Sequence, residues 1–206
     1  MLDARARSLL QAPLDRAAQS IDRPPVTPDR ITLAGLVVGL AAAGAAGQAW
    51  WGAALVMWLA SRVLDGLDGP LARRRGIDGG GAGGFLDIMA DFTVYGAFVV
   101  GVGIGSGQSL LPFLVVLLAY YLNGSAFLAF SSIAERSGRR IDDGRSLSFL
   151  GGLAEGTETI AVHSLWCLLP AFAAPIAWAW AVVVLVSSTQ RVVAGFRSLG
   201  GGVRDA

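Results

Sequence analysis

Long apolar stretches recur along the chain after an amino-terminal segment that is rich in charged residues. A helix needs about 20 apolar residues to cross the hydrocarbon core of a bilayer. Six stretches come close to this length, over residues 31–49, 51–72, 82–104, 109–132, 147–169 and 172–195. The pattern predicts an all-α integral membrane protein with six transmembrane helices.

The first thirty residues follow a different pattern. Arginines and aspartates are interleaved there, and apolar residues recur at helical spacing at Leu10, Leu14, Ala17 and Ile21. This combination is typical of an amphipathic helix that lies in the membrane interface. We therefore expect residues 1–30 to form an amphipathic juxtamembrane segment and residues 31–206 to form one membrane domain.

The composition agrees with a membrane location. Hydrophobic residues make up 54% of the 206 residues and charged residues only 15%, whereas a soluble domain has roughly 25% charged residues. The net charge of +1 argues against binding to nucleic acid, and the lone Cys167 cannot form an internal disulfide.

The basic residues of the loops and ends predict the orientation, because positive loops stay in the cytoplasm. They lie before the first predicted span, in the loops after the second and fourth spans, and in the tail. The two loops contain Arg73, Arg74, Arg75, Arg136, Arg139, Arg140 and Arg145. The three short loops on the opposite side have none. We expect an inner membrane protein of a bacterium, with both termini and the active site on the cytoplasmic side.

Four acidic residues lie within the predicted spans. Asp65 and Asp68 stand near the end of the second span, and Asp87 and Asp91 near the start of the third. Spacings of three and four place each pair on one helix face, and acidic residues in a membrane mark a functional site. Four carboxylates that face each other need a counterion, and their oxygen ligands favour magnesium, manganese or calcium over zinc.

Small and basic residues beside these carboxylates indicate a phosphorylated ligand. Gly66, Gly69 and Gly83 leave space for the ligand to approach the backbone, and Arg73 offers a forked donor to a phosphate oxygen. The cluster lies at the predicted cytoplasmic boundary of the membrane. A substrate with a nucleotide head and a lipid tail fits this place better than a solute that crosses.

Together these residues form the pattern Asp65-x-x-Asp68-Gly69-x-x-Ala72-Arg73 and, after a spacer, Gly83-x-x-x-Asp87-x-x-x-Asp91. The pattern closely resembles the signature of the CDP-alcohol phosphotransferases, which join a phosphatidyl or phospho-alcohol group from a CDP-activated donor to an alcohol. The preceding Thr27-Pro28-Asp29-x-x-Thr32 also resembles that family. The spacer between Arg73 and Gly83 has nine residues where the family has eight, and its glycines can absorb the extra one.

The resemblance implies a role for each of these residues. Asp65, Asp68 and Asp87 would hold a divalent cation that binds the donor's diphosphate. Asp91 would share a second cation and act as the catalytic base that takes the acceptor's hydroxyl proton. The CDP-binding residues would be Asp65, Asp68, Gly69, Ala72, Arg73 and Gly83. The implied cofactors are two Mg²⁺ or Mn²⁺ ions, and the implied assembly is a homodimer.

The fifth predicted span carries a polar stripe at Glu155, Thr159 and His163, with Glu158 beside it. Some members of the family that the chain resembles use a phosphorylated acceptor, such as glycerol 3-phosphate, and have a basic sequence near this point. The acidic stripe therefore favours an acceptor pocket for a neutral polyol or a cationic amino alcohol. Two alternatives stay open: the glutamates pair with Arg145 or Arg191 to hold helices together, and His163 is a hydrogen-bonded packing residue.

The tryptophans form a further group, and we expect them to anchor the protein at the non-cytoplasmic interface. Six occur in the chain, including Trp50, Trp51, Trp178 and Trp180.

The function that the sequence favours is transfer of a phosphatidyl group from CDP-diacylglycerol to a small, non-phosphorylated alcohol, with release of CMP. One alternative is transfer of phosphocholine or phosphoethanolamine from a CDP-amino alcohol to diacylglycerol, since both donors share the CDP part. A cation transporter is the other, because carboxylates in a membrane also mark cation pathways.

Overall fold

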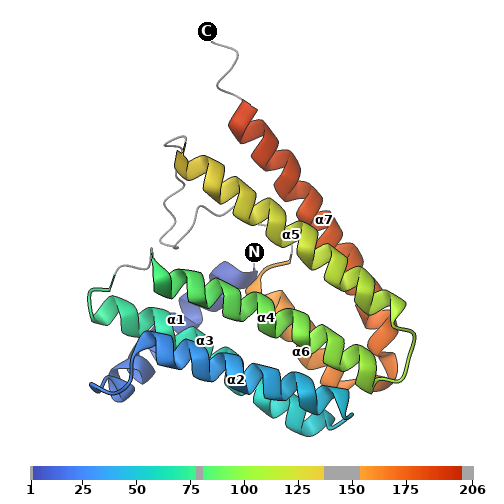
Figure 1. The fold of residues 1–206 in the computed structure, drawn as a ribbon, viewed down its shortest axis with the longest axis horizontal. Coiled ribbons are helices and arrows are strands. Elements are labelled where there is room, and N and C mark those ends of the chain that lie inside the picture. Colours follow the sequence, from blue (N-terminus) through green and yellow to red (C-terminus); the bar gives the residue numbers. More distant parts are fainter. Residues whose placement is uncertain (1, 78–80, 137–153, 201–206) are drawn as a thin grey trace.

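A computed structural model describes residues 2–77, 81–136 and 154–200, and in these parts of the chain every regular element is a helix (Figure 1). The elements are α1 (Leu2–Ile21), α2 (Pro28–Gly47), α3 (Trp51–Arg74), α4 (Ala82–Gly105), α5 (Leu111–Arg136), α6 (Gly156–Leu168), the short 3₁₀ helix η1 (Pro170–Phe172) and α7 (Ala173–Gly200). The predicted all-α class is confirmed.

Four segments among the described residues are long and apolar enough to cross a membrane. They are α2, α4, α5 and the combined segment Pro170–Leu199, which agree with four of the six predicted spans. Of the other two, α3 has 24 residues but carries charged side chains within its length. The span predicted over residues 147–169 contains the 13-residue α6 and begins in residues outside the described ones. The count of six therefore stays a prediction.

The start of α2 explains the first part of the sequence pattern. The Thr27 side chain accepts a hydrogen bond of 3.3 Å from the backbone N–H of Arg30, Pro28 opens the helix, and Asp29 lies in its first turn. A side-chain cap, a proline at the first position and an early acidic residue each stabilise a helix N-terminus. The cap therefore fixes where α2 begins.

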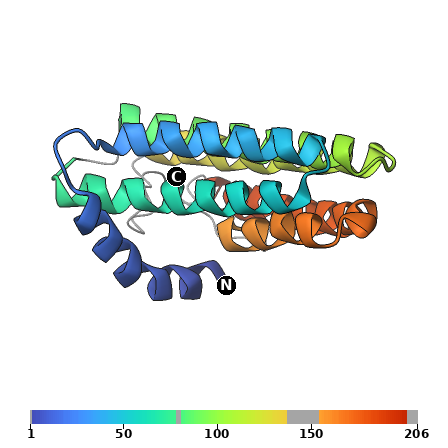
Figure 2. The same cartoon turned by 90° about the horizontal axis from the view of Figure 1, so that it is seen from below.

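α2 packs closely against both α3 and α4. The contact with α4 depends on Gly101 and Gly105, since a Cβ atom at either position would overlap the backbone of Ala43 or Ala46 on α2. Small residues permit such close packing of helices in membranes. Figure 2 shows the result, in which α2 and α4 lie in one layer and α3 and α6 in the other.

The centre of the molecule is aromatic. Trp58, Trp166 and His163 are fully buried there, and Trp180 is 5% exposed. The prediction that the tryptophans anchor the protein at the membrane interface is therefore wrong for Trp58, Trp166 and Trp180. Trp50 and Trp178, in contrast, are exposed. Aromatic side chains bury a large apolar area, which explains why the core uses them.

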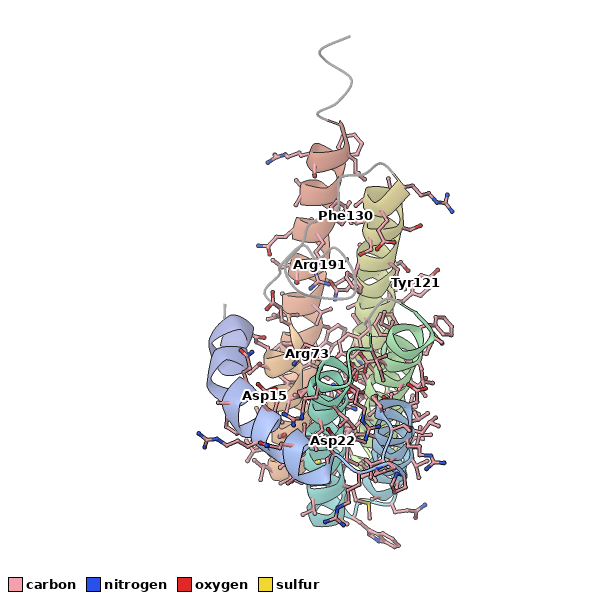
Figure 3. The ribbon with its side chains drawn as sticks, turned by 90° about the vertical axis from the view of Figure 1, so that its left-hand side faces the viewer. Asp15, Asp22, Arg73, Tyr121, Phe130 and Arg191 are labelled. Atoms are coloured by element: carbon pink, nitrogen blue, oxygen red, sulfur yellow. The ribbon has the colours of Figure 1, made fainter. Side chains whose placement is uncertain are left out.

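α1 packs on α3 through the apolar stripe predicted from the sequence. Leu14, Ala17 and Ile21 contact a small core cluster that contains Leu67 and Leu71 of α3. Figures 2 and 3 show α1 outside the two layers, beside α3. Its place in the membrane interface, and the division of the chain at residue 30, stay predictions.

An ionic contact fastens the end of this segment. Asp22 accepts hydrogen bonds of 2.9 and 2.7 Å from Arg75, and Arg74 lies 3.6 Å from the same carboxylate. The contact joins the segment that follows α1 to the carboxyl end of α3 (Figure 3).

Candidate functional site

The four aspartates predicted to act together do lie within range of one another's charge. Asp65 and Asp68 come from α3 and Asp87 and Asp91 from α4, and α2 holds these two helices together. Nη1 of Arg62 lies within 4 Å of a carboxylate oxygen of Asp65 and of one of Asp91, and Asp87 is near enough to Asp68 and Asp91 for their negative charges to repel. The structure thus brings both pairs to one place between the helices.

Asp68 is held by its neighbours on two sides. The Thr32 hydroxyl of α2 donates a hydrogen bond of 2.6 Å to Oδ2, and the Gly69 N–H donates one of 2.6 Å to Oδ1. Asp68 is only 9% exposed and Thr32 only 5%. Both oxygens of a nearly buried carboxylate therefore have donors, and one donor comes from the segment that precedes the motif.

Arg62 is a basic member of this cluster that the sequence pattern did not identify. Its Nη1 lies 2.5 Å from Oδ1 of Asp91 and 3.6 Å from Oδ2 of Asp65. The side chain is 5% exposed. The sequence does hold a signal for it, because an arginine within an apolar segment one turn before Asp65 is costly unless it has a partner. Interpreting the arginines as topology signals alone overlooks this residue.

The glycine positions and Arg73 of the pattern lie near the end of α3 and the start of α4. A Cβ atom at Gly69 would lie 3.4 Å from Nη1 of Arg73, and one at Gly83 would lie 3.3 Å from Oδ1 of Asp29. Arg73 is exposed in the last turn of α3, and Ala72 is partly buried. Gly83, Asp87 and Asp91 share α4. Part of the nine-residue spacer, residues 78–80, lies outside the described residues.

The donor set of this cluster fits a hard divalent cation, because it consists of carboxylate oxygens rather than thiolate or imidazole groups. In the described parts of the chain, however, no three acidic, histidine or cysteine side chains are gathered closely enough to hold one metal ion. Asp65 and Asp91 instead contact Arg62, and Asp68 is held by Thr32 and the backbone. The ligand type, carboxylate oxygen, thus suits a divalent cation, whereas the positions of these oxygens are set by hydrogen-bond donors of the protein.

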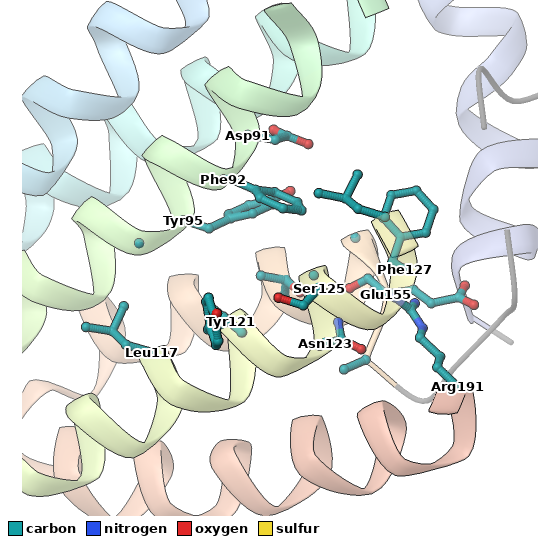
Figure 4. A pocket seen from close by; sticks show the side chains of 17 residues that line it. Asp91, Phe92, Tyr95, Leu117, Tyr121, Asn123, Ser125, Phe127, Glu155 and Arg191 are labelled. Carbon is teal, nitrogen blue, oxygen red and sulfur yellow. Dashed lines mark hydrogen bonds between the residues drawn. The ribbon is translucent and has the colours of Figure 1, made fainter. Parts of the chain in front are cut away.

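A cavity of about 590 Å³ opens directly beside Asp91 (Figure 4). Its walls come from α4, α5, the start of α6 and α7. The lining residues with polar side chains are Asp91, Tyr95, Tyr120, Tyr121, Asn123, Ser125, Glu155, Thr159 and Arg191. Such a cavity, mostly apolar with a few convergent polar groups, has the size and character of a small-molecule site.

The acceptor-pocket residues predicted from the sequence divide into two groups. Glu155 and Thr159 line the cavity, whereas Glu158 and His163 are not among its lining residues. The His163 ring stacks on Phe98, with ring centres 5.4 Å apart, and its Nε2 lies 2.9 Å from the Tyr120 hydroxyl. This position agrees with the alternative in which His163 is a hydrogen-bonded packing residue.

Arg191 of α7 is a second functional candidate that the sequence pattern did not identify as a site residue. It lines the cavity and is 6% exposed, and in Figure 4 it lies on a different wall from Asp91. From the sequence it was expected only as a structural partner of the glutamates. The cavity thus contains an acidic side chain, Glu155, and a basic one, Arg191, in addition to its neutral polar groups.

Comparison with known proteins places these features in a family. The family model for CDP-alcohol phosphatidyltransferase matches residues 25–187. Inner membrane protein YnjF of Escherichia coli strain K12 is 39% identical over 204 residues, which cover 97% of each chain. Phosphatidylinositol phosphate synthase of Mycolicibacterium smegmatis is 33% identical and covers 89% of this chain, and 82% of its own length is matched.

Solved structures share the fold. The phosphatidylinositol phosphate synthase PgsA1 of Mycobacterium tuberculosis, in complex with manganese and citrate, superposes with a TM-score of 0.73 at 24% identity, covering 94% of this chain and 93% of that one. A second crystal structure of PgsA1, with CDP-DAG bound, gives a TM-score of 0.72 at 23% identity and covers 94% and 98%.

Proposed function

Since this chain belongs to the CDP-alcohol phosphatidyltransferase family, we propose that it transfers a phosphatidyl group from CDP-diacylglycerol to a hydroxyl group of a small alcohol and releases CMP. One observation carries the proposal. Asp91 belongs both to the carboxylate cluster, through its contact with Arg62, and to the wall of the 590 Å³ cavity. In this proposal the cluster is the site for the CDP donor, the cavity is the site for the acceptor, and the carboxylate of Asp91 serves both.

The carboxylate cluster is the proposed site for divalent cations, Mg²⁺ or Mn²⁺. We assign Asp65, Asp68 and Asp87 to the cation that binds the donor's diphosphate, and Asp91 to a second cation shared with the acceptor side. When bound, such cations stabilise negative charge on the phosphoryl oxygens and on the departing CMP. The manganese and the CDP-DAG in the two M. tuberculosis structures support a cation and a CDP-linked donor in this fold, and the assignment to single residues rests on the resemblance of the motif.

The chain's own residues would then perform the transfer. Gly69, Ala72 and Gly83 leave space for the CDP group, and Arg73 pairs with a phosphate oxygen. Asp91 accepts the proton of the acceptor hydroxyl as that oxygen forms a bond to the phosphorus that carries diacylglycerol. The bond from this phosphorus to the CMP oxygen breaks, CMP leaves with the bonding electrons, and the proton passes from Asp91 to solvent.

For the acceptor we propose a non-phosphorylated polyol. The cavity beside Asp91 contains hydroxyl and amide groups at Tyr121, Asn123, Ser125 and Thr159, which both donate to and accept from hydroxyl groups. Glu155 adds an acceptor for further hydroxyls or for an ammonium group, so an amino alcohol is also compatible with this wall. The mixed polar lining thus favours an acceptor with several hydrogen-bonding groups.

A phosphorylated polyol is the second candidate, and Arg191 favours it. A nearly buried guanidinium in the cavity wall offers a forked donor to a phosphate. The M. smegmatis relative is named a phosphatidylinositol phosphate synthase, which also favours this acceptor. Glu155 in the same cavity opposes a phosphorylated acceptor, because its carboxylate and the acceptor's phosphate would then place two negative charges in one site. Inositol and inositol phosphate are therefore the decisive pair of acceptors.

The test is release of CMP by the full chain, purified in detergent, with CDP-diacylglycerol and Mg²⁺ or Mn²⁺. The acceptors are inositol, inositol phosphate, glycerol 3-phosphate, serine, ethanolamine and choline, each assayed also with chelator. Metal-dependent release with one acceptor supports the proposal and names the product. CMP release only from CDP-choline or CDP-ethanolamine with diacylglycerol would instead establish the alternative reaction, transfer of a phospho-amino alcohol to diacylglycerol. Cation flux in liposomes without CMP release would establish transport.

The predicted orientation and assembly belong to the same proposal. A cytoplasmic site gives the soluble nucleotide head access to the carboxylate cluster, and the family resemblance implies a homodimer. Labelling of single cysteines introduced near Arg73, in spheroplasts and in inverted vesicles, tests the orientation. Light scattering of the detergent-solubilised protein tests the assembly.

A further inference from the structure

Arg62 is anchored on several sides at once. Its Nη1 contacts Asp91, and its Nη2 donates a hydrogen bond of 3.0 Å to Oγ of Ser61. Ser61 in turn donates a hydrogen bond of 2.8 Å to the carbonyl oxygen of Gly35 on α2. Three helices therefore meet at this guanidinium.

Two aromatic rings complete the surroundings of Arg62. The centre of its guanidinium lies 5.1 Å from the ring centre of Trp58 on α3 and 5.0 Å from that of Tyr95 on α4. Aromatic faces attract cations at such distances, most strongly where water is excluded. The position of the positive charge is thus fixed before any ligand binds.

This anchoring has a consequence for Asp91. Arg62 contacts Oδ1 of Asp91, and Asp91 also lines the cavity, so the guanidinium fixes this carboxylate at the cavity wall. The same guanidinium lies 3.6 Å from Asp65. The single positive charge of Arg62 offsets part of the negative charge of Asp65 and Asp91, and it also repels a second positive charge that approaches them.

We propose that Arg62 is a positioning residue for Asp91 and the built-in counter-charge of the Asp65–Asp91 pair, so that it orients the base and opposes cation binding at Asp91. The inference rests on the proposed function for the role of Asp91 as base. It assigns to Arg62 two effects of opposite direction. Removal of Arg62 should strengthen the binding of a divalent cation and at the same time weaken catalysis.

The main experiment compares the full-length wild type, Arg62→Met and Arg62→Lys in detergent. Mn²⁺ binding, measured by calorimetry without substrate, should become about tenfold tighter in Arg62→Met, because one repelling charge is lost. The kcat for CMP release should fall about 100-fold, as expected for a misplaced general base. Arg62→Lys retains the charge but has no fork, so its Mn²⁺ affinity should stay close to that of the wild type while kcat still falls.

The matched control is Arg74→Met, which removes the same charge from an exposed position of the same helix. It should change neither Mn²⁺ affinity nor kcat. Unchanged or weaker Mn²⁺ binding in Arg62→Met would overturn the proposal, because a residue that only supports packing gives that result. A wild-type kcat in Arg62→Lys would remove the positioning role.

A measurement without metal or turnover separates this inference from the proposed function. In chelator, the thermal stabilities of Arg62→Met, Asp91→Asn and the double variant form a cycle that reports the coupling of the two residues. The double variant should be less destabilised than the sum of the single variants, since neither charge is then left unpaired. Additive losses would overturn the counter-charge role. If the wild type released no CMP while the cycle showed coupling, the proposed function alone would fail.

Discussion

The hydroxyl of Thr32 on α2 donates a hydrogen bond of 2.6 Å to Oδ2 of Asp68 on α3, and both side chains are nearly buried. The two residues are 36 positions apart in the sequence. This contact links the segment that begins the first predicted span to the carboxylate motif. The resemblance of Thr27-Pro28-Asp29-x-x-Thr32 to the family's pattern thus acquires a physical reason, since the segment starts α2 and supplies a donor to the site.

We expect Thr32→Val to lower both stability and activity. The substitution keeps the shape of the side chain but leaves a buried carboxylate oxygen without its donor, which costs about 1–3 kcal/mol. Thermal unfolding in detergent and the metal dependence of CMP release measure the two effects. Thr32→Ser retains the hydroxyl and should stay close to the wild type. Equal behaviour of the two variants would show that the hydrogen bond does not matter.

The second prediction concerns the close contact of α2 and α4. Gly101→Ala should destabilise the protein by about 1–3 kcal/mol, since overpacking of a tight contact forces the backbones apart. The new Cβ would overlap the carbonyl group of Ala43. Gly44→Ala is the control, because a Cβ at Gly44 has no atom within 4 Å. The thermal unfolding midpoint of Gly44→Ala should equal or exceed that of the wild type, and a lower midpoint there would show a cost unrelated to packing.

A pH-dependent contact joins the segment after α1 to α3. The hydrogen bonds from Arg75 hold the pKa of the Asp22 carboxyl below its ordinary value of 3.8. A lowered pKa means that the contact stabilises the folded state above this ordinary value, and that the contribution is lost as the pH falls through the lowered pKa. The difference in unfolding midpoint between the wild type and Asp22→Asn should therefore be present at pH 7 and shrink below about pH 4.

The contact is exposed, so its effect should also be small and decrease at high salt. Limited proteolysis of residues 1–30 at pH 7 gives an independent measure, because a loosened segment is cleaved sooner. A midpoint difference that stayed the same from pH 7 to pH 3 would show that the charge of Asp22 is not the cause.

The sequence was most informative where one physical rule dominated. Apolar length predicted the helices, and four of the six predicted spans coincide with described segments that are long and apolar enough to cross a membrane. The rule that acidic residues in a membrane are costly identified Asp65, Asp68, Asp87 and Asp91, and helical spacing placed each pair on one face. The structure brings these pairs together because α2 packs against both helices, which no local pattern could have shown.

The sequence was least informative where one residue type has two uses. Arginines set membrane topology in loops and balance charge inside helices. The place of Arg62 within an apolar segment was a signal of the second use, but only the fold shows which side chains lie beside Arg62 and which cavity Arg191 lines. Tryptophan likewise serves interfaces and cores, so the burial of Trp58 and Trp166 could not be read from composition. A side chain's partners across helices decide such cases, and these depend on packing.

The role of Asp91 as the catalytic base can be tested by replacing its carboxylate with an amide. Asp91→Asn keeps the size of the side chain but removes the proton acceptor, so kcat should fall by at least about 100-fold. Binding of CDP-diacylglycerol, measured by calorimetry with Mn²⁺, should persist, because Asp65, Asp68 and Asp87 remain. The thermal unfolding midpoint reports any effect of leaving Arg62 without its partner. Turnover close to that of the wild type would remove the base assignment.

The final prediction separates the two acceptor classes through two charged residues of one cavity. If the acceptor is a neutral polyol, as proposed, Glu155→Gln should raise its KM by about tenfold, the loss expected for one hydrogen bond to a charged group. The KM of CDP-diacylglycerol should not change, because Glu155 lies on the α6 side of the cavity, across from the carboxylate cluster. Arg191→Gln should then have the smaller effect. The reverse order, a large rise in acceptor KM for Arg191→Gln and little for Glu155→Gln, would identify a phosphorylated acceptor. An equal rise for donor and acceptor in both variants would show that the two residues only hold helices together.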